Sequence, residues 1–127
     1  MKLVLVRAIE ASLHKRRYLK GLDGRKLTVR SQHAALNTLL QSAGAVLMKK
    51  ALVILNNTLT AQGLKRPQDY AFVANVHDEW QMEVLPSLAE DIGRLSVESI
   101  RKAGEAFTFP CPLDATYRIG KTWAETH

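Results

Sequence analysis

The chain has 127 residues, the size of one domain or of part of one. Hydrophobic residues make up 46% of it, enough for a packed core, which excludes an intrinsically disordered chain. Eighteen Lys and Arg residues against twelve Asp and Glu residues give a net charge of +6, which favours a polyanionic partner. A single cysteine excludes an internal disulfide and fits a reducing cytoplasm.

Residues 1–13 give an ambiguous signal. The apolar run at positions 3–6 predicts a short strand, followed by a helical turn through residues 8–13. The run is too short for a signal sequence or for a membrane span. We therefore expect a soluble cytoplasmic protein without a membrane partner, and we leave residues 1–13 unassigned.

A first β-hairpin is predicted where residues 17–22 and 25–29 flank Asp23-Gly24, because this dipeptide between two strand-like runs is a strong turn signal. The hairpin would carry an excess of positive charge on a stiff ribbon. This pattern also fits an ordinary solvated surface. The cations between positions 15 and 30 are Lys15, Arg16, Arg17, Lys20, Arg25, Lys26 and Arg30.

A long helix is predicted from an N-cap at Ser31 to about Thr60, ended by Gly63 and Pro67. Apolar residues at spacings of three, four and seven mark the face expected in the core. These residues are Leu36, Leu39, Leu40, Ala43, Leu47 and Ile54.

The same helix carries a polar stripe, since His33, Asn37 and Gln41 fall four residues apart and Arg30 lies one turn earlier. Amides and an imidazole can both donate and accept hydrogen bonds. In the DNA minor groove every base pair offers similar acceptors, so amides there could contact any sequence. An ordinary solvated helix face is the alternative interpretation.

A second hairpin is predicted at residues 70–85, with Asp78 and Glu79 side by side at its tip. Two adjacent carboxylates suit Mg²⁺, which binds one or two of them and keeps water or phosphate oxygens as its other ligands. The pair His77-Asp78 also occurs in metal phosphohydrolases, but the chain offers no further His and Asp ligands of that kind. The face expected to pack consists of Trp80, Met82 and Val84, and the opposite face of Gln81, Glu83 and Leu85.

Pro86 opens a second predicted helix that continues to about residue 106, and residues 113–119 read as a last strand. The inward face of this helix would carry Leu88, Ile92, Leu95, Ser99, Ala103 and Ala106. The order of elements indicates an α+β fold. We expect an antiparallel sheet with the acidic-tipped hairpin (about 70–85), covered by two helices (about 31–60 and 86–106).

Several segments together resemble the C-terminal palm portion of family A DNA polymerases, most of all the bacteriophage replicative branch. They are Arg-Arg-Tyr-Leu-Lys-Gly-Leu-Asp-Gly-Arg-Lys at 16–26, Arg30-Ser31 with the helix from His33 to Ala45, and Val76-His77-Asp78-Glu79, which is similar to motif C. The last residues, from Gly120 through Trp123 to His127, also resemble the family's C-terminus. The resemblance marks residues 14–127 as a partial palm domain.

The resemblance implies roles for individual residues. Asp78 would bind the catalytic Mg²⁺, Glu79 would support it, and His77 would lie against the primer terminus, so these three are the candidate catalytic residues. Residues of the polar stripe would contact the primer-template, and the ribbon would follow its phosphate backbone. The candidate DNA-binding residues are Arg30, His33, Asn37, Gln41, Arg16, Arg17, Lys20, Arg25 and Lys26.

Other parts of the family's active site have no match in the sequence: the motif A aspartate, the fingers helix that grips the nucleotide, and the thumb. We therefore expect part of a DNA-directed DNA polymerase, a nucleotidyltransferase of DNA replication, that does not polymerise alone. Deoxynucleoside triphosphates would bind only if a partner chain supplied motif A and fingers. The alternatives are a non-enzymatic DNA-binding module and a self-associating remnant of a phage polymerase. Its place would be the cytoplasm of a bacterium or of a phage-infected host cell.

Overall fold

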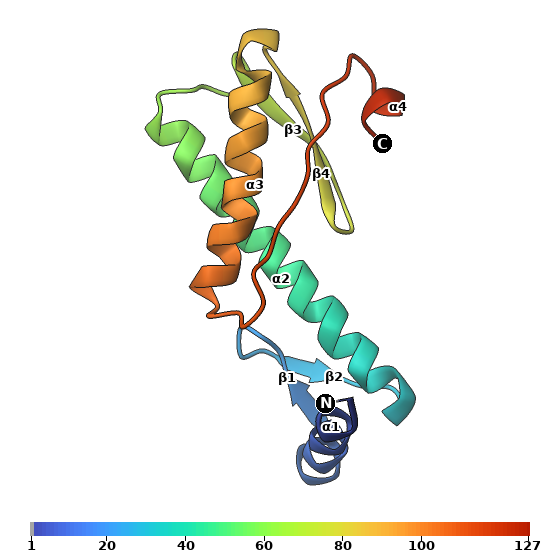
Figure 1. The fold of residues 1–127 in the computed structure, drawn as a ribbon. Coiled ribbons are helices and arrows are strands. Elements are labelled where there is room, and N and C mark those ends of the chain that lie inside the picture. Colours follow the sequence, from blue (N-terminus) through green and yellow to red (C-terminus); the bar gives the residue numbers. More distant parts are fainter. Residues whose placement is uncertain (1) are drawn as a thin grey trace. The chain divides into compact units, whose positions relative to one another are not determined.

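The computed structural model describes residues 2–127 and divides into two compact units, Met1–Val46 and Leu47–His127. Both contain helices and one two-stranded antiparallel sheet, which confirms the predicted α+β class. The elements shown in Figure 1 are α1 (Lys2–Arg16), β1 (Tyr18–Lys20), β2 (Lys26–Thr28), α2 (Gln32–Ala61), β3 (Tyr70–Val76), β4 (Glu79–Val84), the 3-10 turn η1 (Pro86–Leu88), α3 (Ala89–Ala106) and α4 (Trp123–Thr126).

The first unit begins with a helix, so the strand predicted at residues 3–6 is wrong. These residues belong to α1, which is rich in Leu, Ala, Lys, Arg and Glu, all good helix formers. A four-residue apolar run does not distinguish a strand from a helix segment, and the residues that follow it decide. Ile9 of α1 is buried in a small core with Leu19 and Ala35.

The basic hairpin is confirmed. Strands β1 and β2 pair antiparallel, and Gly24 adopts the positive φ of +85° that the turn requires. Asp23 accepts a hydrogen bond from Arg25 Nε at 2.7 Å, and this contact lowers the pKa of the Asp23 carboxyl. The turn is therefore closed by its own ion pair as well as by its glycine.

Helix α2 begins where the cap was predicted, since the backbone N–H of Ala34 donates to Ser31 Oγ at 3.3 Å. It ends near Gly63, which has a φ of +82°. The predicted apolar stripe is wrong in part, because Leu40 is 58% exposed. Apolar residues at fixed spacings of three, four and seven shift gradually around the axis of a helix of this length. The buried face of α2 therefore changes along the helix. The buried residues of α2 are Ala35, Val46, Ala51, Leu55 and Leu59.

By length and composition, α2 could also cross a membrane, with a mean hydropathy of 1.4 over an 18-residue window. The core helix of a soluble protein passes the same test. The apolar character of α2 therefore does not by itself distinguish the two environments.

The core of the second unit lies beneath the β3–β4 hairpin. Leu55 and Leu59 of α2 pack with Tyr70 of β3 and Ile92 of α3, and all four side chains are buried. The predicted inward face of β4 is confirmed, because its alternate side chains pack against this cluster. The surrounding partly buried residues are Leu64, Phe72, Trp80, Met82, Val84, Leu88 and Leu95.

One irregularity interrupts the β3–β4 ladder. Phe72 pairs with Met82 and Ala74 pairs with Gln81, which leaves Val73 as an extra residue. Val73 is 61% exposed. An extra residue of this kind is a β-bulge, which bends its strand and increases the local twist.

The helix predicted to follow Pro86 is confirmed as η1 and α3, but residues 113–119 are not a strand. Figure 1 shows this segment as an extended chain that runs along α3. Tyr117 covers Gly93 and Leu113 covers Gly104, so two helix glycines make room for it. Alternating apolar residues indicate an extended backbone, yet they do not reveal whether its neighbour is a strand or a helix.

Polar contacts fix the same segment. The hydroxyl of Tyr117 donates to Glu90 Oε2 at 2.8 Å, and Arg101 Nη2 donates to Asp114 Oδ1 at 2.9 Å. The backbone N–H of Ala115 and the Arg101 guanidinium both lower the pKa of Asp114. These contacts tie both ends of the extended segment to α3.

The contact between Gly93 and Tyr117 predicts a size limit. A Cβ at position 93 would lie 2.4 Å from Tyr117 Cδ2. We expect Gly93→Ala to reduce the free energy of unfolding by about 1–2 kcal/mol, because overpacking outweighs the gain in helix propensity. Gly44→Ala is the matched control, since a Cβ there has no neighbour within 4 Å. Urea unfolding should show Gly44→Ala neutral or stabilising, and equal effects of the two variants would contradict the packing argument.

Candidate active-site hairpin and DNA-binding surface

The tip of the β3–β4 hairpin is formed by His77 and Asp78. Glu79 is the first residue of β4 and pairs with Val76, so the predicted Asp-Glu tip is wrong by one position. His77 has a φ of +53°, a conformation in which His, Asn and Asp are enriched among non-glycine residues. The side chains of both turn residues are exposed. The hairpin therefore presents one carboxylate at its turn and a second at the start of a strand.

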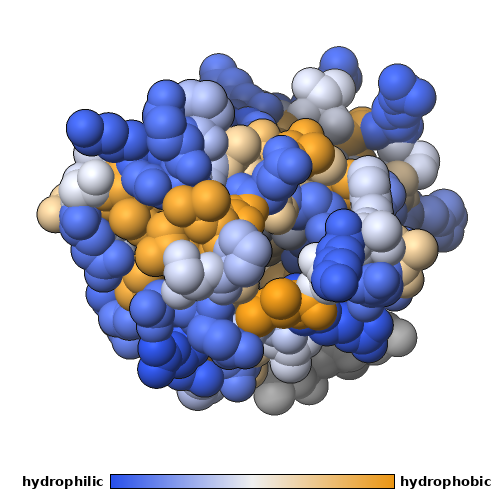
Figure 2. Space-filling view, turned by 90° about the horizontal axis from the view of Figure 1, so that it is seen from above, coloured by the Kyte–Doolittle hydropathy of each residue, from blue (hydrophilic) through white to orange (hydrophobic). Residues whose placement is uncertain are grey.

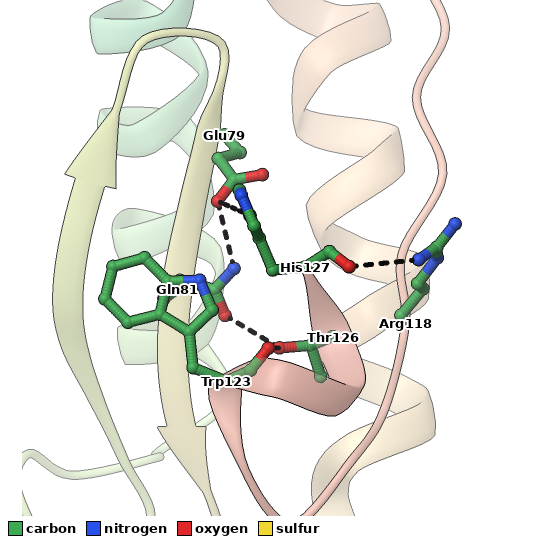
Figure 3. A network of polar contacts seen from close by, with 6 residues as sticks. All are labelled: Glu79, Gln81, Arg118, Trp123, Thr126 and His127. Atoms are coloured by element: carbon green, nitrogen blue, oxygen red, sulfur yellow. Dashed lines mark hydrogen bonds and ion pairs between the residues drawn. The ribbon is translucent and has the colours of Figure 1, made fainter.

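Glu79 belongs to a polar network with the end of the chain (Figure 3). Its Oε1 accepts a hydrogen bond from Gln81 Nε2 at 3.2 Å and lies 3.2 Å from His127 Nδ1. Gln81 Oε1 in turn accepts one from Thr126 Oγ1 at 3.3 Å. Gln81, Thr126 and His127 were not predicted as part of the site. Gln81 lies two residues along β4 from Glu79, where alternation in a strand could have indicated it. No spacing rule joins Thr126 or His127 to positions this far away.

The described residues do not form a complete Mg²⁺ site. Within residues 2–127, no group of three or more His, Cys, Asp and Glu side chains is placed to hold a metal ion. Asp78 offers one exposed carboxylate, and Glu79 Oε1 is already engaged by Gln81 and His127.

The predicted DNA-binding cations gather in the first unit. Arg16 is the last residue of α1 and Arg17 follows it, Lys20 lies in β1, and Arg25 and Lys26 follow the turn, all with exposed side chains. Two of them have partners, since Arg25 forms a 2.6 Å ion pair with Asp23 and Lys26 Nζ lies 5.1 Å from the centre of the Tyr18 ring. Among the ion pairs of the described residues, Arg16, Arg17 and Lys20 do not appear, so their full charge faces solvent.

The polar stripe lies in the same unit. His33, Asn37 and Gln41 are exposed on the first turns of α2, and Arg30 is exposed just before it. The structure thus brings the ribbon and the stripe into one unit, whereas His77, Asp78 and Glu79 belong to the other. Contacts of these residues with DNA stay a prediction.

A model of DNA polymerase family A matches residues 6–125. The chain belongs to this family. The match begins ahead of His14, where the sequence resemblance was first detected, and so it includes much of α1. The predicted resemblance is confirmed.

The phage branch is also confirmed. The chain is 44% identical over 116 residues to the DNA-directed DNA polymerases of Enterobacteria phage T3 and Escherichia phage T7, which covers 89% of the chain. It is 34% identical over 113 residues to DNA polymerase I of Bacillus caldotenax. The chain spans only 16% of the phage enzymes and 12% of the bacterial one.

The fold matches that of a solved family A structure. The POL domain of Pol1 from M. smegmatis, in complex with DNA primer-template and dNTP, superposes with a TM-score of 0.72. It covers 95% of this chain and 22% of the larger domain at 21% identity. The chain thus has the fold of one part of a polymerase domain.

Proposed function

We propose that the chain contributes the motif C hairpin and primer-template contacts to a DNA-directed DNA polymerase acting in DNA replication. The observation that carries this proposal is the 44% identity to the phage T3 and T7 enzymes along 89% of the chain. The chain would act in the cytoplasm of a bacterium or of a phage-infected host cell. Because the chain spans 16% of those enzymes, the remaining functions need segments beyond these residues.

In this proposal Asp78 is the metal-binding and catalytic carboxylate, with His77 at the primer terminus and Glu79 in support. The exposed position of Asp78 on a turn would allow another polymerase segment to approach it. Mg²⁺ would require further ligands from that segment, because the described residues hold no cluster of three. Binding of deoxynucleoside triphosphates would depend on the same partner, and the isolated chain would not polymerise.

The complemented reaction tests the role of Asp78. We expect a polymerase fragment carrying motif A and fingers, mixed with this chain, to extend a primer in the presence of Mg²⁺. Asp78→Ala should abolish the extension, because it removes the carboxylate at the turn of the β3–β4 hairpin. Glu83→Ala is the matched control, since Glu83 is an exposed carboxylate on the same hairpin and should leave the rate unchanged. Extension that survives Asp78→Ala would contradict the assignment.

DNA binding by the first unit would combine two kinds of contact. Arg16, Arg17 and Lys20 supply exposed charge for phosphates, and Asn37 and Gln41 supply exposed amides for groove acceptors. Neither kind distinguishes one base sequence from another. The proposed primer-template contact is therefore general, as a replicative enzyme requires.

Salt dependence tests the phosphate contacts. We expect the chain to bind duplex DNA with an affinity that falls steeply as salt rises, without a requirement for Mg²⁺. Lys20→Ala should reduce the slope of log K against log salt by about 1 and weaken all sequences alike. Lys49→Ala, an exposed lysine of α2 in the second unit, is the control and should change neither quantity. A binding constant that does not respond to salt would rule out the ribbon as a phosphate contact.

Self-association is a second candidate, favoured by exposed apolar side chains. Orange apolar groups are open to solvent on the face drawn in Figure 2. In the second unit Val53, Val73 and Ile119 are each more than half exposed. Exposed apolar surface of this kind favours contact with another protein surface.

Sedimentation velocity over a range of concentrations tests this second candidate. We expect the average mass to rise with concentration in the wild type. Val53→Ser should shift the rise to higher concentration, because it makes the exposed α2 surface polar. Thr60→Ser, at another exposed position of α2, is the control. A monomer at all concentrations would remove self-association as a function.

A further inference from the structure

The last residues of the chain hold the start of β4, next to the proposed catalytic turn. We propose that His127 is a positioning residue that, together with Thr126, fixes the Glu79 carboxylate beside Asp78. This proposal deepens the proposed function, since Glu79 is there the supporting residue of the active site. Under this proposal, one carboxylate oxygen of Glu79 is held by contacts with other side chains of the protein.

The contacts around Glu79 form a chain that links two strand residues to two terminal ones (Figure 3). Gln81 Nε2 donates to Glu79 Oε1 at 3.2 Å, and His127 Nδ1 lies 3.2 Å from the same oxygen. The single hydroxyl hydrogen of Thr126 has two acceptors within reach, Gln81 Oε1 at 3.3 Å and the carbonyl of Trp123 at 3.1 Å, and its contact with Gln81 supports the orientation of the amide toward Glu79. The carboxylate is thus contacted from its own strand by Gln81 and from the residue that follows α4, His127.

His127 is itself held in place. Its backbone N–H donates to the carbonyl of Trp123 at 2.9 Å, and its own carbonyl accepts from Arg118 Nη1 at 3.4 Å. Its ring meets the Trp123 ring edge-on, with 6.1 Å between the ring centres. Two contacts therefore hold the backbone of His127, and the Trp123 ring restricts the imidazole itself. A donor that is already oriented loses less entropy when it forms a hydrogen bond.

The shared oxygen limits what Glu79 can do. Oε1 is engaged by Gln81 and His127, whereas no interaction of the described residues involves Oε2. While these contacts hold, Glu79 cannot grip a cation with both oxygens. It can offer only Oε2 to a water molecule or to an ion bound by Asp78. Loss of His127 would leave Gln81 as the remaining partner of Oε1 among the described residues, and so make this oxygen more available to a cation.

The isolated, ¹⁵N-labelled chain can be titrated with Mn²⁺ as the probe. Mn²⁺ favours oxygen ligands and broadens nearby NMR signals. We expect His127→Ala to tighten Mn²⁺ binding at the hairpin turn by about two- to fivefold, the effect of releasing one hydrogen bond. His127→Asn should retain the wild-type value, because its amide nitrogen can occupy the place of Nδ1. His14→Ala, which removes an exposed imidazole of α1, is the matched control.

A double-mutant cycle separates positioning from a merely structural role. In a Glu79→Ala background, His127→Ala should no longer change Mn²⁺ binding, because its effect passes through Glu79. Unchanged or weaker binding in His127→Ala would overturn the proposal. An effect that persists without Glu79 would overturn it equally.

The complemented polymerase supplies a second readout. His127→Ala should lower kcat with little change in KM for the nucleotide, and His127→Asn should restore kcat. An unchanged kcat in His127→Ala would contradict the positioning role. If the wild-type mixture does not extend a primer at all, the proposed function fails, and the Mn²⁺ comparison still decides whether His127 positions Glu79.

Discussion

The second unit depends on one interaction, the burial of four side chains in a shared core. These are Leu55, Leu59, Tyr70 and Ile92. A two-stranded hairpin is at best marginally stable in water, so β3 and β4 need a surface to pack on. Each fully buried leucine contributes about 1.5–3 kcal/mol, far more than any exposed contact of the hairpin. The helices therefore stabilise the strands, and the strands carry the turn with Asp78 beyond the edge of this core.

A second constraint comes from the segment after α3. It lies over two helix glycines, is tied to α3 through Asp114 and Tyr117, and ends in contact with Glu79. The segment after α3 thus connects this helix with the start of β4.

Local chemistry made part of this structure predictable. Asp23-Gly24 specified a turn and Ser31 specified a helix start, because both signals act within a few residues. The helical state of residues 2–16 and the place of Glu79 in β4 were missed, since a short apolar run and a two-residue turn each allow two solutions. The contact of Glu79 with His127 was missed for another reason: it depends on how residues 113–127 fold back, which no sequence spacing encodes. Family resemblance marked the right residues without revealing these contacts.

The bulge at Val73 separates two properties of the hairpin that usually change together: which residues pair across the strands, and the direction in which the turn projects. Phe72 and Ala74 pair with Met82 and Gln81, which are consecutive in β4, so the ladder on either side of Val73 would keep its partners if this residue were removed. The bend that Val73 introduces would be lost, however, and with it the direction in which the turn projects. In evolutionary terms, a change in length at this position can re-aim an acidic turn by degrees while every cross-strand neighbour stays the same.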